Sequence, residues 1–456
     1  MRRLRPSLFL AAALWALGAG VAPAASPPPD FKQAKTPAGI DYWYGVQPTE
    51  PDEIVNFGWR DGVIADMPGK EGLLRMGPSQ MFAGTTDMSD GEYFERMNDL
   101  HAHASLSSGF ETTRGQIRAP KDKFGEVADL AGASLRAPRL ADATIDRLRK
   151  RYVSQARDDG AKPSSMIWEA AMLALLGDHM QTRANRPETI EGVTRADIEA
   201  WRGRVFARED LVIVASGPLA PDALGPMIDR AFASLPAKGG HKKFDAKDYQ
   251  LAGRTIVIER DVPQTILLLV GRTSIVPEAG SSKASIANQI LGAGTDSRLL
   301  NAIRQDLGAA YGISSGATSL SSRQRVLSIS TSVSHDKAKA ALDIIKATYA
   351  KWREGGVSED EFSFAKAKFV NGYESGIRQP GEAGGSLLAI LLDGLDAEVY
   401  RSAEARLRAY TRDDINAAIK DKFTAPPLTT FIVTPKASDF AADCVIKAAA
   451  EVAGCK

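Results

Sequence analysis

The stretch LGAGTDSRLLNAIRQDLGAAYGISSG, residues 291–316, contains the pattern from which the fold of the chain is predicted. An apolar helix is expected before it, and Gly292 and Gly294 interrupt that helix because glycine is unfavourable in a helix interior. Asp296 or Ser297 can then cap a second helix, since short polar side chains accept hydrogen bonds from the first free N–H groups. The stretch therefore predicts two helices separated by a glycine-containing break.

The second helix is expected to bury one face and to end near Gly308. Four apolar residues recur at helical spacing, namely Leu299, Leu300, Ile303 and Leu307. Arg304 lies off this apolar face, and Tyr311 begins a segment of small residues that predicts a strand. One helix end and one strand start can therefore direct a guanidinium and a phenol toward the same place.

Residues 294–311 fit the pattern G-x-x-S-R-L-x-x-x-x-R-x-x-x-G-x-x-Y. This pattern resembles the C-terminal-domain signature of the M16 (pitrilysin-like, inverzincin) metallopeptidases. The resemblance implies that Arg304 and Tyr311 reach across to the active site of another domain or subunit, where they hold the substrate backbone near the zinc. Without the resemblance, a solvated Arg304 and a core Tyr311 would explain the same spacing.

An earlier segment, GLLRMGPSQMFAGT at residues 72–85, resembles the catalytic helix of the same family. In that helix an H-x-x-E-H motif supplies two zinc-binding histidines and a glutamate that acts as general base. The matching positions here are Arg75, Pro78 and Ser79. Arginine has no lone pair to donate, proline disrupts a helix and cannot act as a base, and serine is a poor zinc ligand.

The third zinc ligand of the family is a glutamate on a later helix. The corresponding helix is expected at residues 144–157, and matching its pattern to Val153 places Ala156 at the ligand position. No H-x-x-E-H or H-E-x-x-H occurs anywhere in the sequence. The resemblance therefore implies a family member without a catalytic site or metal site of its own, and zinc is expected in a partner subunit.

The first 25 residues are expected to be a cleaved signal peptide. Arg2, Arg3 and Arg5 precede a short apolar run, and Ala22-Pro23-Ala24 is an A-x-A cleavage site. These features favour secretion into a bacterial periplasm, with no membrane span after cleavage. Residues 26–41 are rich in proline and polar residues and are expected to form a disordered lead-in.

The composition excludes few functions but argues against a nucleic-acid partner. The 456 residues are 44% hydrophobic and 25% charged, which is typical of a globular chain of two to three domains. A formal net charge of +1 lacks the basic excess of nucleic-acid-binding proteins. Cys444 and Cys455, expected in a last helix and tail, could pair in an oxidising periplasm or remain as free thiols.

An internal repeat predicts two homologous halves. Thr194-Arg-Ala-Asp-Ile and Phe206 match Thr411-Arg-Asp-Asp-Ile and Phe423, and both matches have the same offset along the chain. The expected domains are residues 42–236 and 250–456, joined by a solvated linker at residues 237–249. The resemblance implies an α+β fold in which each half is a mainly antiparallel sheet with helices packed on it.

Three functional hypotheses follow from these patterns. The first is a non-catalytic, substrate-binding subunit that pairs with a zinc-bearing M16 peptidase subunit and supplies Arg304 and Tyr311 to its active site. Its ligand would be an extended or unfolded peptide. The second is a free-standing peptide-binding or structural protein without peptidase activity. The third is a peptidase with an unrecognised metal site.

Overall fold

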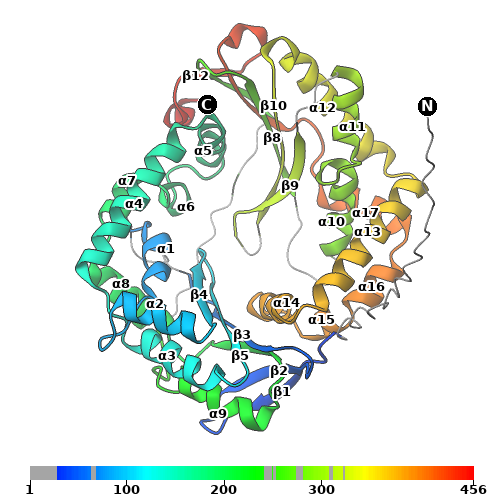
Figure 1. Cartoon of the computed structure of the whole chain (residues 1–456). Coiled ribbons are helices and arrows are strands. Elements are labelled where there is room, and N and C mark those ends of the chain that lie inside the picture. Colours follow the sequence, from blue (N-terminus) through cyan, green and yellow to red (C-terminus); the bar gives the residue numbers. More distant parts are fainter. Residues whose placement is uncertain are drawn as a thin grey trace, which may run out of the picture.

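The computed structural model describes residues 28–62, 68–240, 249, 253–273, 281–307, 312–321 and 324–455. Within them the chain forms two six-stranded sheets that lie at opposite ends of the molecule, with helices between and around them (Figure 1). The expected signal peptide at residues 1–25, residues 241–248 of the expected linker, and Tyr311 lie outside the described residues.

The first sheet has the strand order β1-β2-β6-β3-β5-β4. β2 and β6 are parallel, and the other neighbouring strands are antiparallel. The strands are β1 (Lys32–Lys35), β2 (Asp41–Val46), β3 (Asp52–Trp59), β4 (His103–Ser108), β5 (Thr113–Pro120) and β6 (Val212–Gly217).

The second sheet has the strand order β12-β7-β11-β8-β10-β9. β7 is parallel to both β11 and β12, and the remaining neighbours are antiparallel. The strands are β7 (Thr255–Glu259), β8 (Thr265–Thr273), β9 (Ile313–Ser319), β10 (Arg325–Val333), β11 (Thr429–Thr434) and β12 (Cys444–Ile446).

The two sheets repeat one topology. The order β2-β6-β3-β5-β4 in the first corresponds to β7-β11-β8-β10-β9 in the second. β6 and β11 occupy the same place, and their first residues, Val212 and Thr429, have the same offset along the chain as Thr194 and Thr411. The predicted α+β fold with two mainly antiparallel sheets is therefore confirmed.

Helices cover both sheets. Those before the linker are α1 (Leu73–Met76), the 3-10 helix η1 (Pro78–Gln80), α2 (Asp90–Asp99), α3 (Phe124–Arg136), α4 (Asp142–Ala161), α5 (Pro163–Leu176), α6 (Met180–Arg183), α7 (Pro187–Glu191), α8 (Arg195–Val205) and α9 (Pro221–Phe232). Those after it are α10 (Ser281–Asn288), the π-helix η2 (Gln289–Ala293), α11 (Arg298–Leu307), α12 (His335–Gly355), α13 (Glu359–Ile377), α14 (Pro380–Leu392), α15 (Glu398–Arg401), α16 (Ala403–Ala409), α17 (Arg412–Lys422), and the 3-10 helices η3 (Ala437–Asp439) and η4 (Ala449–Gly454). None of the helices in the described ranges combines the length and apolar character that crossing a bilayer requires.

Two helices pack on the sheet of the opposite half. α5 contacts β8 and β11, and its Ile167 shares an apolar cluster with Phe431. α14 contacts β3 and β6, and its Leu387 shares a cluster with Val214. The two helices begin at equivalent positions of the repeat, Pro163 and Pro380. The halves are therefore joined by an exchange of equivalent helices as well as by the linker.

This exchange explains why the sequences of the central strands β6 and β11 are largely continuous runs of apolar residues. In β6, Ile213 and Ala215 belong to the core that includes α3 and α9, whereas Val214 belongs to the core that includes α14. In β11, Ile432 and Phe431 likewise belong to different cores. A strand that is buried on both faces has no polar face, so its side chains do not alternate between apolar and polar.

The predicted disordered lead-in at residues 26–41 is wrong for its described part. β1 pairs antiparallel with β2 at the edge of the first sheet. Phe31 is 3% exposed and packs edge-on against Tyr400 of α15, with ring centroids 5.4 Å apart. The prediction failed because the backbone of a polar edge strand can be paired, and because its apolar anchors Phe31 and Ile40 are isolated in the sequence.

Both ends of the expected linker are attached to the folded chain. The Gly240 N–H donates to the carbonyl oxygen of Arg204 at 3.1 Å. Tyr249 is 3% exposed, and its hydroxyl donates to the carbonyl oxygen of Arg325 at 2.7 Å. The interpretation as a solvated connector is therefore wrong at Tyr249, because the aromatic ring provides apolar area for the second core.

The described part of residues 291–316 has the predicted order of a glycine-containing break, a helix and a strand, whereas the expected helix end at Gly308 lies outside the described residues. The glycine-containing break is η2, and α11 follows it. Leu299 and Ile303 are fully buried, and Leu307 packs partly buried against the same core. The Lys337 ammonium donates to the carbonyl oxygen of Leu307 at 2.8 Å, which satisfies one of the free acceptors at the end of α11. β9 follows from Ile313 and leads back into the second sheet.

Candidate functional site

The segment that resembles the catalytic helix forms one helical turn followed by a 3-10 turn. α1 ends at Met76, and η1 begins at Pro78. Proline has no N–H to donate, and its ring clashes with the preceding turn, so a regular helix does not continue through this position. The Ser79 hydroxyl donates to the carbonyl oxygen of Met76 at 3.0 Å. The helix face on which the motif would place its metal ligands is therefore interrupted.

The structure brings α1 against α4, so it places the four predicted motif positions in one region. Ala156 of α4 is 6% exposed and belongs to the same core as Leu73 of α1. Arg75 is partly exposed. The pKa of the Asp159 carboxyl is lowered, mainly by its hydrogen bond from Lys162 and to a smaller extent by the charge of Arg75.

The side chains at these positions do not fit a zinc ion. Arg75 is a permanent cation, Pro78 and Ala156 carry no donor atom, and Ser79 offers only a hydroxyl. In the part of the chain that the structure describes, no three His, Cys, Asp or Glu residues form a group that could hold a metal ion. No catalytic step of this chain is therefore assigned to zinc.

A buried ion pair holds the start of α1 in place. Glu71 is fully buried, and its Oε1 accepts a hydrogen bond from Nε of Arg183 in α6 at 2.7 Å. Nζ of Lys70 lies 3.0 Å from Oδ2 of Asp197, and Asp197 belongs to the capping box of α8. Glu71 and Arg183 give no signal in the sequence, because they are 112 residues apart and form no recognisable motif. Removing one partner of a buried ion pair typically costs about 3–5 kcal/mol, so the pair makes this region structurally important.

Arg304 occupies an exposed position in the last turn of α11. Leu299 and Ile303 direct the opposite face of the helix into the core. Within the described residues Arg304 forms no hydrogen bond or ion pair. Figure 1 places α11 and α1 on opposite sides of the molecule, so the structure does not bring Arg304 to the degenerate motif of its own chain.

The two cysteines form a disulfide bond. Cys444 is the first residue of β12, and Cys455 directly follows η4. The predicted last helix and tail are therefore an edge strand and a 3-10 helix. The bond joins the end of the chain to the edge of the second sheet, where β12 pairs with β7.

The sequence is similar to known proteases over most of its length. Residues 192–369 match the family model described as the Peptidase M16 inactive domain. An uncharacterized zinc protease of Rickettsia felis is 22% identical over 342 residues, which cover 74% of this chain and 82% of that protein. An uncharacterized zinc protease of Mycobacterium tuberculosis is 24% identical over 272 residues, covering 58% of this chain and 61% of that protein.

Solved structures share the fold. The peptidase M16 inactive domain from Pseudomonas fluorescens aligns with a TM-score of 0.80 and 18% identity, over 89% of this chain and 98% of that one. The periplasmic protease PqqL from Escherichia coli aligns with a TM-score of 0.76 and 14% identity, over 95% of this chain and 49% of that one. With the family match and the replaced motif residues, these findings lead to one conclusion. The chain is similar to M16 peptidase-family proteins in its sequence at residues 192–369 and in its fold, and its sequence contains no H-x-x-E-H motif.

Proposed function

We propose that this chain is the non-catalytic, substrate-binding subunit of a bacterial periplasmic M16-type zinc peptidase heterodimer. The observation that carries the proposal is an exposed Arg304, without a partner in the described residues, in a chain whose own motif positions cannot hold zinc. The partner subunit would bind the zinc ion. This chain would bind an extended or unfolded peptide and present Arg304 and Tyr311 to the partner's active site.

In this proposal Arg304 donates charge-assisted hydrogen bonds to the substrate carbonyl oxygen and to the oxyanion that develops on it. Tyr311 adds a phenolic donor to the same oxygen. A donor of this kind typically stabilises the transition state by about 2.7–4 kcal/mol. Both residues would act on chemistry performed by the partner, so the isolated chain would have no peptidase activity.

Three observations support a periplasmic location. Residues 1–25 have the pattern of a cleaved signal peptide. The disulfide between Cys444 and Cys455 is of the kind that persists in oxidising compartments. One structural neighbour, PqqL, is described as a periplasmic protease.

Co-purification tests the proposal directly. The tagged chain would be expressed in its native host, and the eluate analysed by mass spectrometry, zinc content and peptidase activity. A stoichiometric zinc-bearing M16 partner, with activity only in the complex, is the expected result. A chain that elutes alone, zinc-free and inert would favour the free-standing binding or structural role. Stoichiometric zinc in the isolated chain would favour a peptidase with an unrecognised metal site.

The role of Arg304 is tested by Arg304→Ala in the assembled complex. We expect kcat to fall about 10²–10³-fold while the two subunits still assemble, because only a transition-state contact is lost. Gln305→Ala, on the adjacent exposed position of α11, is the matched control and should leave turnover unchanged. Normal turnover in Arg304→Ala would contradict the proposed role.

A further inference from the structure

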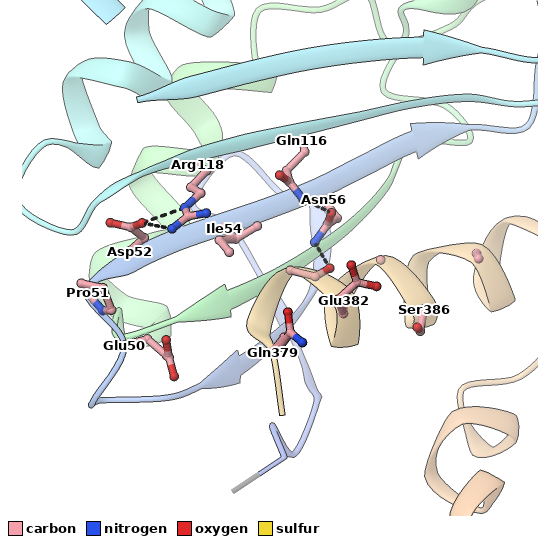
Figure 2. A pocket seen from close by; sticks show the side chains of 13 residues that line it. Glu50, Pro51, Asp52, Ile54, Asn56, Gln116, Arg118, Gln379, Glu382 and Ser386 are labelled. Atoms are coloured by element: carbon pink, nitrogen blue, oxygen red, sulfur yellow. Dashed lines mark hydrogen bonds and ion pairs between the residues drawn. The ribbon is translucent and has the colours of Figure 1, made fainter. Parts of the chain in front are cut away.

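A cavity of about 660 Å³ lies between the first sheet and the first turns of α14, beside Glu382. Figure 2 shows how hydrogen bonds hold its two walls together. Nδ2 of Asn56 in β3 donates to the carbonyl oxygen of Gly381 at 3.5 Å, and Oδ1 of Asn56 accepts from Nε2 of Gln116 at 3.0 Å. The junction between the two halves explains this cavity, so the cavity does not by itself point to a ligand.

A smaller cavity of about 200 Å³ lies between η2 and α13 in the second half. Ile290 of η2 and Ala365 of α13 are buried and give the cavity an apolar wall. Phe364 of α13 also lines the cavity, yet this residue is 57% exposed. The ring therefore lies at the rim of an apolar cavity, and the fold of the chain leaves both of them uncovered.

Two charged residues of α13 also line this smaller cavity, and they differ in their partners. Both carboxylate oxygens of Glu361 accept hydrogen bonds from the Arg298 guanidinium, each at 2.6 Å. This bidentate pair fixes α13 to the start of α11 and uses the charge of Glu361. Lys368 forms no hydrogen bond or ion pair within the described residues. Its positive charge is therefore available to a second molecule.

Asp360, Phe364 and Lys368 are exposed and follow one another at intervals of four residues, so they form one stripe along α13. We call them the α13 stripe. Asp360, like Lys368, forms no hydrogen bond or ion pair among the residues that the structure describes. The two charges lie about 12 Å apart along the helix axis, on either side of the ring. The α13 stripe therefore has a negative end, an aromatic centre and a positive end.

This arrangement is complementary to itself. If a second α13 packs antiparallel across a two-fold axis at Phe364, Asp360 of each copy faces Lys368 of the other. The two rings meet at the centre, beside the two apolar cavities. A closed two-fold dimer uses the same patch on both copies, which requires such symmetry of charge. An unrelated partner would not require it, so the α13 stripe favours a second copy of this chain.

The repeated scaffold does not require the α13 stripe. Nη2 of Arg149 in α4 donates to the carbonyl oxygen of Val193. Nζ of Lys366 in α13 donates to that of Tyr410, which is the same pair displaced by the offset of the internal repeat. α4 is therefore the counterpart of α13. Its residues at the positions that match the stripe are Ala143, Arg147 and Arg151. They include no carboxylate and no aromatic ring, so the fold forms without this pattern.

We propose that the α13 stripe binds the α13 stripe of a second copy of this chain. The two helices are antiparallel, the Phe364 rings pack together over the cavities, and Asp360 pairs with Lys368 at each end. The inference goes beyond the proposed function and does not depend on it. The α13 stripe lies near Arg298 at the start of α11, whereas Arg304 lies in its last turn and stays available to the zinc-bearing subunit.

Sedimentation velocity of the full mature chain, over a concentration series at low ionic strength, tests the inference. We expect a reversible dimer. Phe364→Ala should raise its Kd about tenfold or more, because the ring is lost from both copies. At concentrations where the unmodified chain is a monomer, Phe364→Ala should have the same Tm, which separates loss of the dimer from loss of the fold.

Charge reversal identifies the occupant of the surface. Asp360→Lys and Lys368→Glu should each raise the Kd about tenfold, because each places like charges opposite one another at both ends. An equal mixture of the two variants should regain the Kd of the unmodified chain, because both lysines of one variant then face carboxylates of the other. Lys351→Glu, at an exposed position of α12, makes the same change of charge and should leave the Kd unchanged.

A chain that stays monomeric throughout the concentration series would overturn the inference. A dimer that keeps its Kd in Phe364→Ala, or a mixture that binds no more tightly than the two separate variants, would also overturn it. If Lys368→Glu instead prevents co-purification of the zinc-bearing subunit, the surface belongs to that subunit. The inference then fails while the proposed function stands.

Discussion

The two halves of the chain repeat the same scaffold and differ in the residues that they place on it. Each half has a T-x-x-D capping box whose aspartate also binds a lysine: Thr194, Asp197 and Lys70 in the first half, and Thr411, Asp414 and Lys283 in the second. The lysine–aspartate distances are 3.0 Å and 2.7 Å. The sheets have the same strand order. These shared features are structural and require no metal.

The halves differ where the family signatures occur. In the first half Pro78 ends α1, and the buried pair of Glu71 and Arg183 holds the remaining turn. In the second half α11 is a regular helix that exposes Arg304. At the motif positions Ala156 packs in the core and Pro78 begins a 3-10 turn, so the fold accommodates residues there that cannot bind a metal. The comparison indicates that stability and chemistry are carried by different residues.

The largest expected effect comes from the two exchanged helices. Ile167→Ala in α5 and Leu387→Ala in α14 each remove a side chain that is 1% exposed. Each should lower the free energy of unfolding by about 2–5 kcal/mol. Because each helix belongs to the core of the opposite half, both substitutions should shift a single cooperative transition, measured in urea by tryptophan fluorescence and far-UV circular dichroism.

The control for this comparison is Phe364→Ala in α13, where the side chain is 57% exposed. Its effect should stay within about 0.5 kcal/mol. Two separate transitions, with Leu387→Ala moving only one of them, would show that the halves unfold independently despite the exchange.

A second difference between the sheets involves a buried carboxyl group. Glu53 of β3 and Thr265 of β8 occupy equivalent positions in the two sheets. The next residue of β3, Ile54, pairs with Ser216 of β6. The next residue of β8, Ile266, pairs with Val433, which is the matching position of β11. Glu53 is 1% exposed, and its Oε2 accepts a hydrogen bond from the Leu219 N–H at 3.0 Å. Burial raises the pKa of Glu53 from 4.5 to about 8. Thr265 is equally buried but neutral.

The buried carboxyl group of Glu53 predicts that the free energy of unfolding depends on pH. Thr265, its counterpart in the second sheet, adds no such dependence because it does not titrate. Below pH 4.5 Glu53 is protonated in both the folded and the unfolded chain. As the pH rises to about 8, the folded chain retains a proton that the unfolded chain releases. Between these two pH values the free energy of unfolding therefore falls as the pH rises, by roughly 1.4 kcal/mol per pH unit from Glu53 alone.

Urea unfolding at several pH values would measure this slope. Glu53→Gln should flatten it, because the amide does not titrate, whereas the exposed control Glu354→Gln should leave it unchanged. Parallel stability curves for the unmodified chain and Glu53→Gln would show that Glu53 ionises normally in the folded state.

The smallest expected effect concerns the repeated capping boxes. Thr194→Ala and Thr411→Ala each remove a hydroxyl that accepts from the third N–H of its helix, at 3.2 Å in both halves. Each should cost about 1 kcal/mol, while the Thr→Ser variants should retain most of the stability. The two losses should be equal and should add in the double variant, because the sites share no partner. A measurable cost in only one half would show that the matching sequences are not equivalent in the fold.

Much of the fold could be predicted from local patterns, and the failures have physical reasons. The α11 face and the helix break before it follow from spacing alone, so the sequence placed them correctly. β1 was missed because Phe31 and Ile40 do not form a recognisable apolar pattern. The replacement of the ligands at Arg75 and Pro78 could be read from side-chain chemistry, whereas their support by Glu71 could not.

The sequence by itself determined the repeated halves, the helix break before α11, the buried face of α11 and the absence of an H-x-x-E-H motif, because periodicity and side-chain chemistry are local properties. Only the tertiary structure decided which sheet α5 and α14 cover, which partner Glu71 takes, and where the cavity beside Glu382 forms. These features depend on contacts between residues that are far apart along the chain. Their formation is decided by which apolar surfaces are buried together when the two halves pack.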